Sequence, residues 1–401
     1  MLSESGSIEP AVKVGSIKYA VRDVLIVADE AKRAGREMIY LNIGDPNIFD
    51  YKTPPVIVEA VCKALRDGWN GYANSEGLPQ ATEAIRADAE RKGLRNIQQV
   101  YVANGCSEGI EIALSALCNA GENILTPSPG YPLYTALVAK LGLEPNPYYL
   151  NEANGWQPDL KDMERRVNED TRAIVLINPN NPTGSVCSRE TLEGVVALAR
   201  RHGLLIIADE IYGALTLDGM EHIPLASIDA DVPMMTFDGL SKAYLAPGLR
   251  IGWGILTGKT EKVAAYKAAV AQLLRARISA NHPEQFAIAP ALGDRSHLPA
   301  LVEKVTRRRD LTVKMLNAIP GISCVAPRGA LYAFPSLKID PAREMEWVHG
   351  LIRQTGVVVV HGGGFGQRPG TAHFRVVFLP EEPVLARAYT QIAQYAARFG
   401  G

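Results

Sequence analysis

Apolar residues form short continuous runs through the middle of the chain, and segments with helical periodicity separate many of them. Read as strands, these runs are Val100–Ala103, Asn123–Thr126, Ala173–Ile177, Leu204–Ala208, Met234–Phe237 and Ile251–Leu256. Helices are expected near 108–119, 131–141, 189–201 and 260–276. Continuous apolar strands that alternate with helices are typical of a parallel sheet covered on both faces. The pattern predicts an α/β fold with a large, doubly wound, mostly parallel sheet.

Different patterns flank this region. Thr53-Pro54 opens a helix with a capping residue and a first-turn proline, Gly68 ends it, and a second helix runs from Pro79 to about Gly93. Beyond about residue 295, helices and short strands are expected at Leu298–Leu316, Ala330–Phe334, from Arg343, near 357–360, near 374–378 and from Glu382. We therefore expect a large domain over 53–294 and a small α+β domain made of 1–52 and 295–401.

The amino-acid composition and the balance of charges exclude some classes of function. The 401 residues are 47% apolar and 21% charged, as in ordinary soluble proteins. Lys and Arg number 42 against 43 Asp and Glu, and nucleic-acid binding needs an excess of positive charge, so nucleic acid is excluded as the main partner. The densest basic run, Arg307-Arg308-Arg309, is interpreted as a solvated helix face.

The five cysteines lie far apart with no C-x-x-C pair, which fits neither a disulfide framework nor a zinc site. The first residues show no secretory signal, and no run of about 18 apolar residues is present to span a membrane. We expect a cytoplasmic soluble protein that contacts no membrane and holds no metal.

Polar clusters follow four of the predicted strands, where ligands bind in open α/β sheets. They are Ala103–Glu108, Asn178–Gly184, Asp209–Tyr212 and Asp238–Lys242, the last followed by Pro247–Arg250. Each has an ordinary alternative. The Gly105-Cys106-Ser107 turn either binds a phosphate or is a common helix start. Asp209 alone reads as a helix cap, Lys242 as a lysine that snorkels from a semi-apolar setting, and the proline-rich cluster as a turn. Jointly they point to one ligand site.

The segments "NPNNPTG", "ADEIY", "GLSKAYLAPGLRIGW" and "FRVVFLP" occur in this order. Together they resemble the class I/II aminotransferases of pyridoxal-phosphate fold type I. The resemblance covers nearly the whole chain, from Asn42-Ile43-Gly44-Asp45-Pro46 to Arg375. It implies a homodimeric enzyme with pyridoxal 5′-phosphate as cofactor, bound in the large domain.

The resemblance implies a role for each matching residue. Lys242 would bond to the cofactor aldehyde and later carry the substrate proton, since it supplies both an amine and a base. Asp209 would keep the ring nitrogen protonated. Tyr212 and Asn181 would reach the ring's phenolic oxygen, and Tyr131 would stack on the ring.

The phosphate and substrate ligands follow in the same way. The phosphate ligands implied are Gly105, Cys106, Ser107, Ser241, Arg250 and Tyr72 of the partner subunit, which makes the sites of a homodimer shared. Family members often carry a serine three residues before the lysine, but this chain has Gly239 there. Arg375 would bind the α-carboxylate bidentately, with Asn181 beside it and Gly44 letting the backbone approach the substrate. Without the resemblance, Arg375 reads equally well as a surface arginine.

Three further segments resemble one subfamily of these aminotransferases. The segments "YAVRDV", "ISANHPEQFAIAPAL" and "RRRDLTVKMLNAIPGISCVAPRGALYAFP" are most similar to bacterial glutamate–pyruvate (alanine) aminotransferases. This implies that Tyr19 and Arg22 close over the substrate side chain. Arg277 is either a distal-carboxylate ligand or a helix-surface residue. The loop 361–366 carries more glycines than such enzymes usually have, which leaves the flexibility of a lid there, and so the range of substrate side chains, open.

We therefore predict ping-pong transamination, with alanine or glutamate as donor and 2-oxoglutarate or pyruvate as acceptor. The alternatives are an aminotransferase for aspartate, aromatic or many substrates, and a fold type I C–S lyase or decarboxylase. A cofactor-binding transcription regulator would need a DNA-binding module, for which the chain has neither room nor charge. A cofactor-free homologue would be expected to lack Lys242 or Asp209, and both are present.

Overall fold

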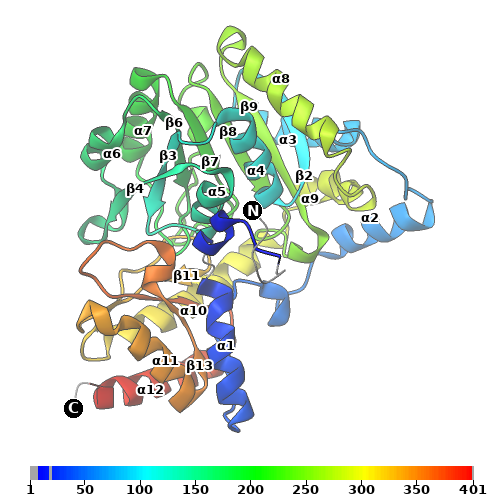
Figure 1. Ribbon diagram of the computed structural model, residues 1–401. Helices are drawn as coiled ribbons and strands as arrows, with labels where there is room; N and C mark the ends of the chain where they lie inside the picture. The colour runs from blue at the N-terminus through cyan, green and yellow to red at the C-terminus, as the bar shows by residue number, and fades with distance from the viewer. Residues whose placement is uncertain (1–7, 18–19, 400–401) are drawn as a thin grey trace.

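The large sheet predicted for the middle of the chain is present. The structure, a computed structural model, describes residues 8–17 and 20–399. Its main sheet has eight strands in the order β2-β9-β8-β7-β6-β3-β4-β5 (Figure 1). Their bounds are β2 Ile97–Asn104, β3 Asn123–Ser128, β4 Glu144–Asn151, β5 Gln157–Pro158, β6 Thr171–Ile177, β7 Leu205–Asp209, β8 Met234–Gly239 and β9 Ile251–Thr257. All six predicted strands are confirmed, whereas β4 and β5 were not predicted.

Two strands run antiparallel to the rest of the sheet, namely β9, beside the edge strand β2, and the edge strand β5, which pairs with β4. Strand β9 runs antiparallel to both β2 and β8, while β4, β3, β6, β7 and β8 are parallel to one another. The chain passes from β8 to β9 through 240–250, which contains no α-helix. A parallel crossover needs a longer connection, usually a helix, so this short link reverses the strand direction.

Helices cover both faces of the sheet, because alternate strand residues point to opposite sides. Val175 packs in a cluster with helices α4, α5 and α8, and its neighbour Ile174 packs in the cluster that includes α7. The helices of this region are α2 Pro55–Arg66, α3 Pro79–Arg91, α4 Cys106–Leu117, α5 Pro132–Leu141, α6 Leu160–Arg166, α7 Arg189–His202, α8 Thr260–Ala276 and α9 Ile288–Gly293. The doubly wound architecture is confirmed.

Segments from the two ends of the chain pack together below the sheet (Figure 1). Strand β1 (Ile39–Tyr40) pairs in parallel with β13 (Val357–Val358). The other strands here are β10 Ile322–Ser323, β11 Tyr332–Ala333, β12 Ser336–Leu337, β14 Val360–His361 and β15 Phe374–Val377. The helices are α1 Ala20–Arg33, which was not predicted, α10 Leu298–Asn317, α11 Glu344–Thr355 and α12 Glu382–Phe399. The expected domain boundaries at 53 and 295 stay a prediction.

The interpretation of the basic run on α10 as a solvated face is wrong for two of its three residues. Arg308 and Arg309 are only 2% and 4% exposed. Arg308 donates to both carboxylate oxygens of Asp50 at 2.8 Å, and Arg309 pairs with Asp218. The Arg308 guanidinium holds the pKa of Asp50 down at about 2. Their partners are distant in sequence, so the charge pattern alone did not reveal the burial.

All five cysteines are free thiols. Within residues 8–17 and 20–399, no helix is both long enough and apolar enough to cross a membrane.

Candidate active site

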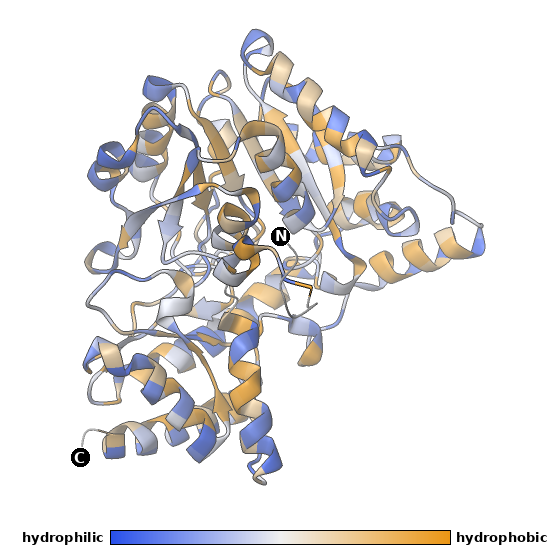
Figure 2. Ribbon diagram, in the orientation of Figure 1, coloured by the Kyte–Doolittle hydropathy of each residue, from blue (hydrophilic) through white to orange (hydrophobic). Residues whose placement is uncertain are grey.

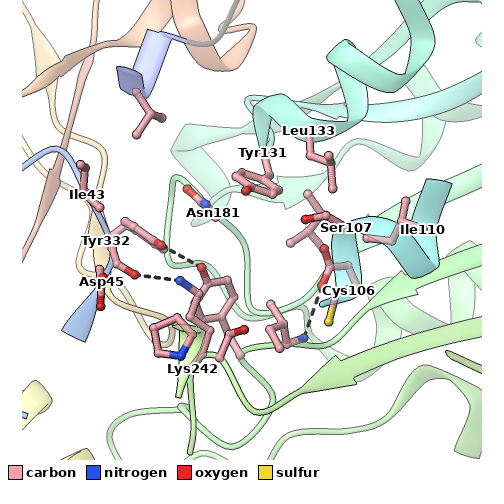
Figure 3. A pocket seen from close by; sticks show the side chains of 18 of the residues that line it. Ile43, Asp45, Cys106, Ser107, Ile110, Tyr131, Leu133, Asn181, Lys242 and Tyr332 are labelled. Carbon is pink, nitrogen blue, oxygen red and sulfur yellow. Dashed lines mark hydrogen bonds between the residues drawn. The ribbon is translucent and has the colours of Figure 1, made fainter. Parts of the chain in front are cut away.

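A pocket of about 500 Å³ opens where the carboxyl ends of the parallel strands meet the segments from the chain ends (Figure 3). Twelve of the predicted residues line it, namely Arg22, Gly44, Cys106, Ser107, Tyr131, Asn181, Asp209, Tyr212, Ser241, Lys242, Arg250 and Arg375. They come from regions as far apart as α1 and β15. The structure therefore gathers the polar clusters, as the sequence predicted.

Three predicted residues stand apart from this lining. Gly105 adjoins it as the residue before α4. Tyr72 lies outside the pocket and is 83% exposed. Tyr19 lies outside the described residues.

Asp209 is a buried carboxylate at the end of β7. Its Oδ2 accepts a hydrogen bond from the Tyr134 hydroxyl at 3.0 Å, and its Oδ1 accepts one from the Ile211 N–H at 3.4 Å. Burial raises the pKa of Asp209 to about 6, although these two hydrogen bonds act in the opposite direction. The helix-cap alternative is wrong because no helix follows the residue. A partner that keeps a proton beside this carboxylate would stabilise its charged form.

Lys242 enters the pocket from the loop after β8. Its Nζ donates to the carbonyl oxygen of Gly44 at 2.7 Å and lies 5.9 Å from the centre of the Tyr212 ring. Figure 3 shows Lys242, Tyr131, Asn181 and Tyr332 around the same space. The lysine amine therefore lies inside the pocket.

The turn between β2 and α4 supplies backbone donors at the start of a 12-residue helix. Gly105 has φ +79°, and a Cβ there would run into the guanidinium of Arg250. Arg250 itself has φ +53°, and its Nη1 donates to the Pro247 carbonyl at 3.0 Å. The close approach that glycine allows sets a cation beside these amides, which suits an anion.

Gly239 has no room for the serine that is common in relatives. A Cβ there would lie 2.7 Å from the carbonyl oxygen of Ile251 and 2.9 Å from Cα of Gly252. Both belong to β9, which pairs directly with β8. A side-chain hydroxyl is therefore not available to a ligand at this position.

Arg375 is 2% exposed and lies on the central strand of a three-stranded sheet, so the surface-arginine alternative is wrong. Its Nη1 donates to Asn181 Oδ1 at 3.0 Å, and its Nη2 donates to the carbonyl oxygen of Asn42. Its Cζ lies 4.6 Å from the centre of the Tyr332 ring and 4.7 Å from that of Phe365. Such burial suits a guanidinium that recognises a carboxylate.

Tyr332 is a pocket residue that sequence reasoning missed. Its hydroxyl lies 2.8 Å from that of Tyr212, and a Cβ on Gly44 would collide with its ring. Gly44 is therefore needed for this close approach. Tyr134, the hydroxyl donor to Asp209, was missed as well. The position of each residue in the "GALYAFP" and "PGYPLY" segments carries no local signal of a polar role.

Arg277 is absent from the residues lining the pocket. Its Nη1 pairs with Glu108 Oε2 at 2.6 Å, and its Nη2 donates to the Ser75 carbonyl at 2.8 Å. Its side chain is only 13% exposed, so the helix-surface alternative is wrong. A role as distal-carboxylate ligand stays a prediction.

Solved structures share this architecture. Alanine aminotransferase from Pyrococcus furiosus superposes with a TM-score of 0.93 at 38% identity, over 97% of this chain and 100% of that one. A double mutant of aspartate aminotransferase from Thermus thermophilus gives a TM-score of 0.86 at 28% identity, over 97% of this chain and 100% of that one. The fold and the pocket thus define an enzyme of the fold type I aminotransferase class.

The family follows from the sequence comparison. A family model described as aminotransferase class I and II matches residues 36–392. The chain belongs to this family of pyridoxal-phosphate-dependent enzymes, and the predicted resemblance is confirmed. Alanine aminotransferase of Mycobacterium tuberculosis is 39% identical over 399 residues, which cover 97% of this chain and 92% of that protein. Glutamate-pyruvate aminotransferase AlaA of Escherichia coli is 36% identical over 403 residues, which cover 98% of each chain.

The donor set of the pocket fits the cofactor of this family. Helix-start amides, the Ser107 and Ser241 hydroxyls and the Arg250 cation suit a phosphate. The buried Asp209 carboxylate suits a protonated ring nitrogen, and the Lys242 amine suits an aldehyde.

Proposed function

We propose that the chain binds pyridoxal 5′-phosphate and transfers an amino group between alanine and 2-oxoglutarate, and in reverse between glutamate and pyruvate. The observation that carries the proposal is the meeting of Lys242, Asp209 and Arg375 in one pocket. The names of the M. tuberculosis, E. coli and P. furiosus relatives support the substrate pair. When bound, the cofactor supplies an electron sink for the charge that develops at the substrate Cα.

Lys242 is proposed as the covalent attachment point and as the base that moves the Cα proton. Its Nζ already has an acceptor, the Gly44 carbonyl at 2.7 Å, which fixes the direction of the side chain. Tyr212 lies beside it, and burial raises the pKa of the Tyr212 phenol well above its ordinary value. A phenol that stays protonated can donate a hydrogen bond to an oxyanion on the cofactor ring.

Asp209 is proposed to hold a proton at the ring nitrogen. Its burial makes an unpaired charge costly, so a protonated ring nitrogen would be its natural partner. Tyr134 fixes the orientation of the carboxylate through the 3.0 Å hydrogen bond. Tyr131, at the start of α5, is proposed to cover the face of the ring.

Gly105, Cys106, Ser107, Ser241 and Arg250 are proposed to bind the phosphate. Burial raises the pKa of the Cys106 thiol well above its ordinary value, so Cys106 would contribute its backbone N–H and not a thiolate. The helix start and the Arg250 cation would act on the same anion.

Arg375 and Asn181 are proposed to bind the α-carboxylate. The planar guanidinium offers paired donors that match the two oxygens of a carboxylate. Arg22 is exposed, lines the pocket from α1 and has no ion pair with any described residue. Its position supports a contact with the substrate side chain.

A homodimer with shared sites is also proposed. Large apolar side chains are exposed on α2 and beside it, at Val58, Leu65, Trp69, Tyr72 and Ile278. Figure 2 shows the apolar residues along this helix. A patch of this kind marks an interaction surface, and Tyr72 within it would reach the partner's phosphate.

The free cysteines support a reducing, cytoplasmic location.

The proposal is tested by offering the purified holoenzyme one amino acid at a time. Oxo-acid formation and the change in cofactor absorbance are measured together. Alanine and glutamate should give the highest kcat/KM values. A strong preference for aspartate or aromatic donors would overturn the substrate assignment, and elimination products without amino transfer would indicate a lyase.

A further inference from the structure

The glycine-rich loop near the end of the chain is ordered by close packing. Residues 362–365 form a 3-10 turn, with His361 Nδ1 accepting a hydrogen bond from the Gly364 N–H at 3.2 Å. A Cβ on Gly362 would lie 2.8 Å from Cβ of His373, and one on Gly364 would collide with Ala20 at the start of α1. These contacts leave no room for a side chain at either position. The glycines allow the loop to pack closely against His373 and Ala20.

Glu344 anchors this loop from the first turn of α11. Its carboxylate is only 4% exposed and accepts hydrogen bonds from the N–H groups of Gly363 and His373, both at 2.8 Å, and from the Gln367 amide. Burial alone would raise the pKa of Glu344, but these donors and His361 hold it below its ordinary value. An anion with several fixed donors is a rigid anchor.

Phe365 connects the anchored loop to the pocket. The centre of its ring lies 4.7 Å from Cζ of Arg375, and its carbonyl oxygen accepts a hydrogen bond from the Gly130 N–H at 2.8 Å. Gly130 directly precedes Tyr131, which lines the same pocket. A guanidinium over an aromatic face gains a desolvated cation–π contact that restrains its plane.

We propose that Glu344 and Phe365 are positioning residues for the carboxylate-binding arginine. Glu344 holds the loop 362–366, and the ring of Phe365 then sets the plane of the Arg375 guanidinium. The inference rests on the proposed function, because Arg375 binds the substrate carboxylate there. Neither residue lines the pocket itself.

The test compares Phe365→Leu and Glu344→Gln with Arg375→Lys in the holoenzyme. Glu346→Gln is the matched control, since Glu346 lies on the same helix in an exposed ion pair with Arg343. The measurements are KM and kcat for alanine, the dissociation constant of glutarate, the cofactor content per protomer and the melting temperature. Glutarate carries carboxylates but neither an amine nor an oxo group.

Both test variants should raise KM and the glutarate dissociation constant about tenfold with kcat little changed, as for a lost uniform binding contact. Glu346→Gln should match the wild type. If Arg375→Lys weakens binding but both test variants bind glutarate like the wild type, the positioning inference is wrong. If either variant lowers only kcat, melting temperature and cofactor content, its role is structural and the inference is equally wrong. If Arg375→Lys has no effect on KM, the proposed carboxylate role itself fails, and the inference fails with it.

Discussion

The two sides of the pocket are built in different ways. On the sheet side, Asp209 ends β7, and Lys242 follows the adjacent strand β8 by three residues. On the opposite side, Arg375 lies on a short strand and bonds to Asn181 and Asn42, which are 194 and 333 positions away in sequence. The sheet side takes its geometry from regular strand ends, whereas the arginine side exists only after distant segments have packed.

The two sides of the pocket are also proposed to bind different molecules, the cofactor on one side and the substrate on the other. The sheet side carries the groups proposed for the cofactor, among them Asp209, which accepts from Tyr134, and Lys242, which donates to the Gly44 carbonyl. The arginine side carries the groups proposed for the substrate. We expect substitutions on the sheet side to reduce kcat by orders of magnitude and substitutions on the arginine side to change KM, because binding contacts act on the ground state as well as the transition state.

Lys242→Ala should have the largest effect. Loss of the residue that is both attachment point and base should lower kcat by about five orders of magnitude, as for other nucleophile deletions. Borohydride should no longer fix the cofactor to the protein, as followed by absorbance after denaturation. Lys259→Ala is the control, since Lys259 forms a surface ion pair with Asp231. Cofactor fixed by borohydride in Lys242→Ala would show that another residue is the attachment point.

Asp209→Asn should have the second largest effect on kcat. The neutral amide keeps the shape of the side chain but no longer holds a proton on the ring nitrogen, so kcat should fall about a thousandfold. KM for alanine should change much less than kcat. Turnover close to that of the wild type would refute the proposed role and blur the distinction between the two sides.

Sequence reasoning recovered the sheet side because its signals are local. Apolar runs followed by polar clusters located β6, β7 and β8 and the residues after them. Strand β4 was missed since Pro145 and Pro147 are unusual in strands. They are tolerated because the pairing with β5 begins only at Leu150, which leaves one edge unpaired beside the prolines.

The arginine side needed the family resemblance. Arg375 was assigned by its motif, but Tyr332 and Phe365 were not found, because their importance comes from contacts with the guanidinium across the fold. The burial of Arg308 was missed for the same reason, since Asp50 lies 258 positions away. Residue spacing does not encode such pairs.

In the cofactor-free protein, the burial of Asp209 should make the free energy of unfolding depend on pH. Its pKa rises from 3.8 to about 6 on folding, so folding binds a proton and the stability it contributes is lost as the pH rises from about 4 through 6. Asp209→Asn removes this cost, which is at most about 3 kcal/mol above pH 7 and absent below pH 4. We expect a net gain of about 1–2 kcal/mol at pH 7, because an amide is a poorer partner for two hydrogen-bond donors. Urea unfolding at pH 7 and below pH 4 measures the free energy of unfolding of the variant and of the wild type. The same difference between the two proteins at both pH values would contradict this prediction.

Gly364→Ala should give the smallest effect, and it probes the arginine side. The added methyl group meets Ala20, so the loop and the start of α1 must separate, at a cost of about 1–2 kcal/mol. Because Arg22 lies two residues beyond Ala20, KM for glutamate should rise severalfold with kcat nearly unchanged. Gly363→Ala is the matched control, since its nearest neighbour would lie 3.4 Å from the new Cβ. If Gly363→Ala raised KM as much as Gly364→Ala, general stiffness of the loop and not the contact with α1 would control substrate binding.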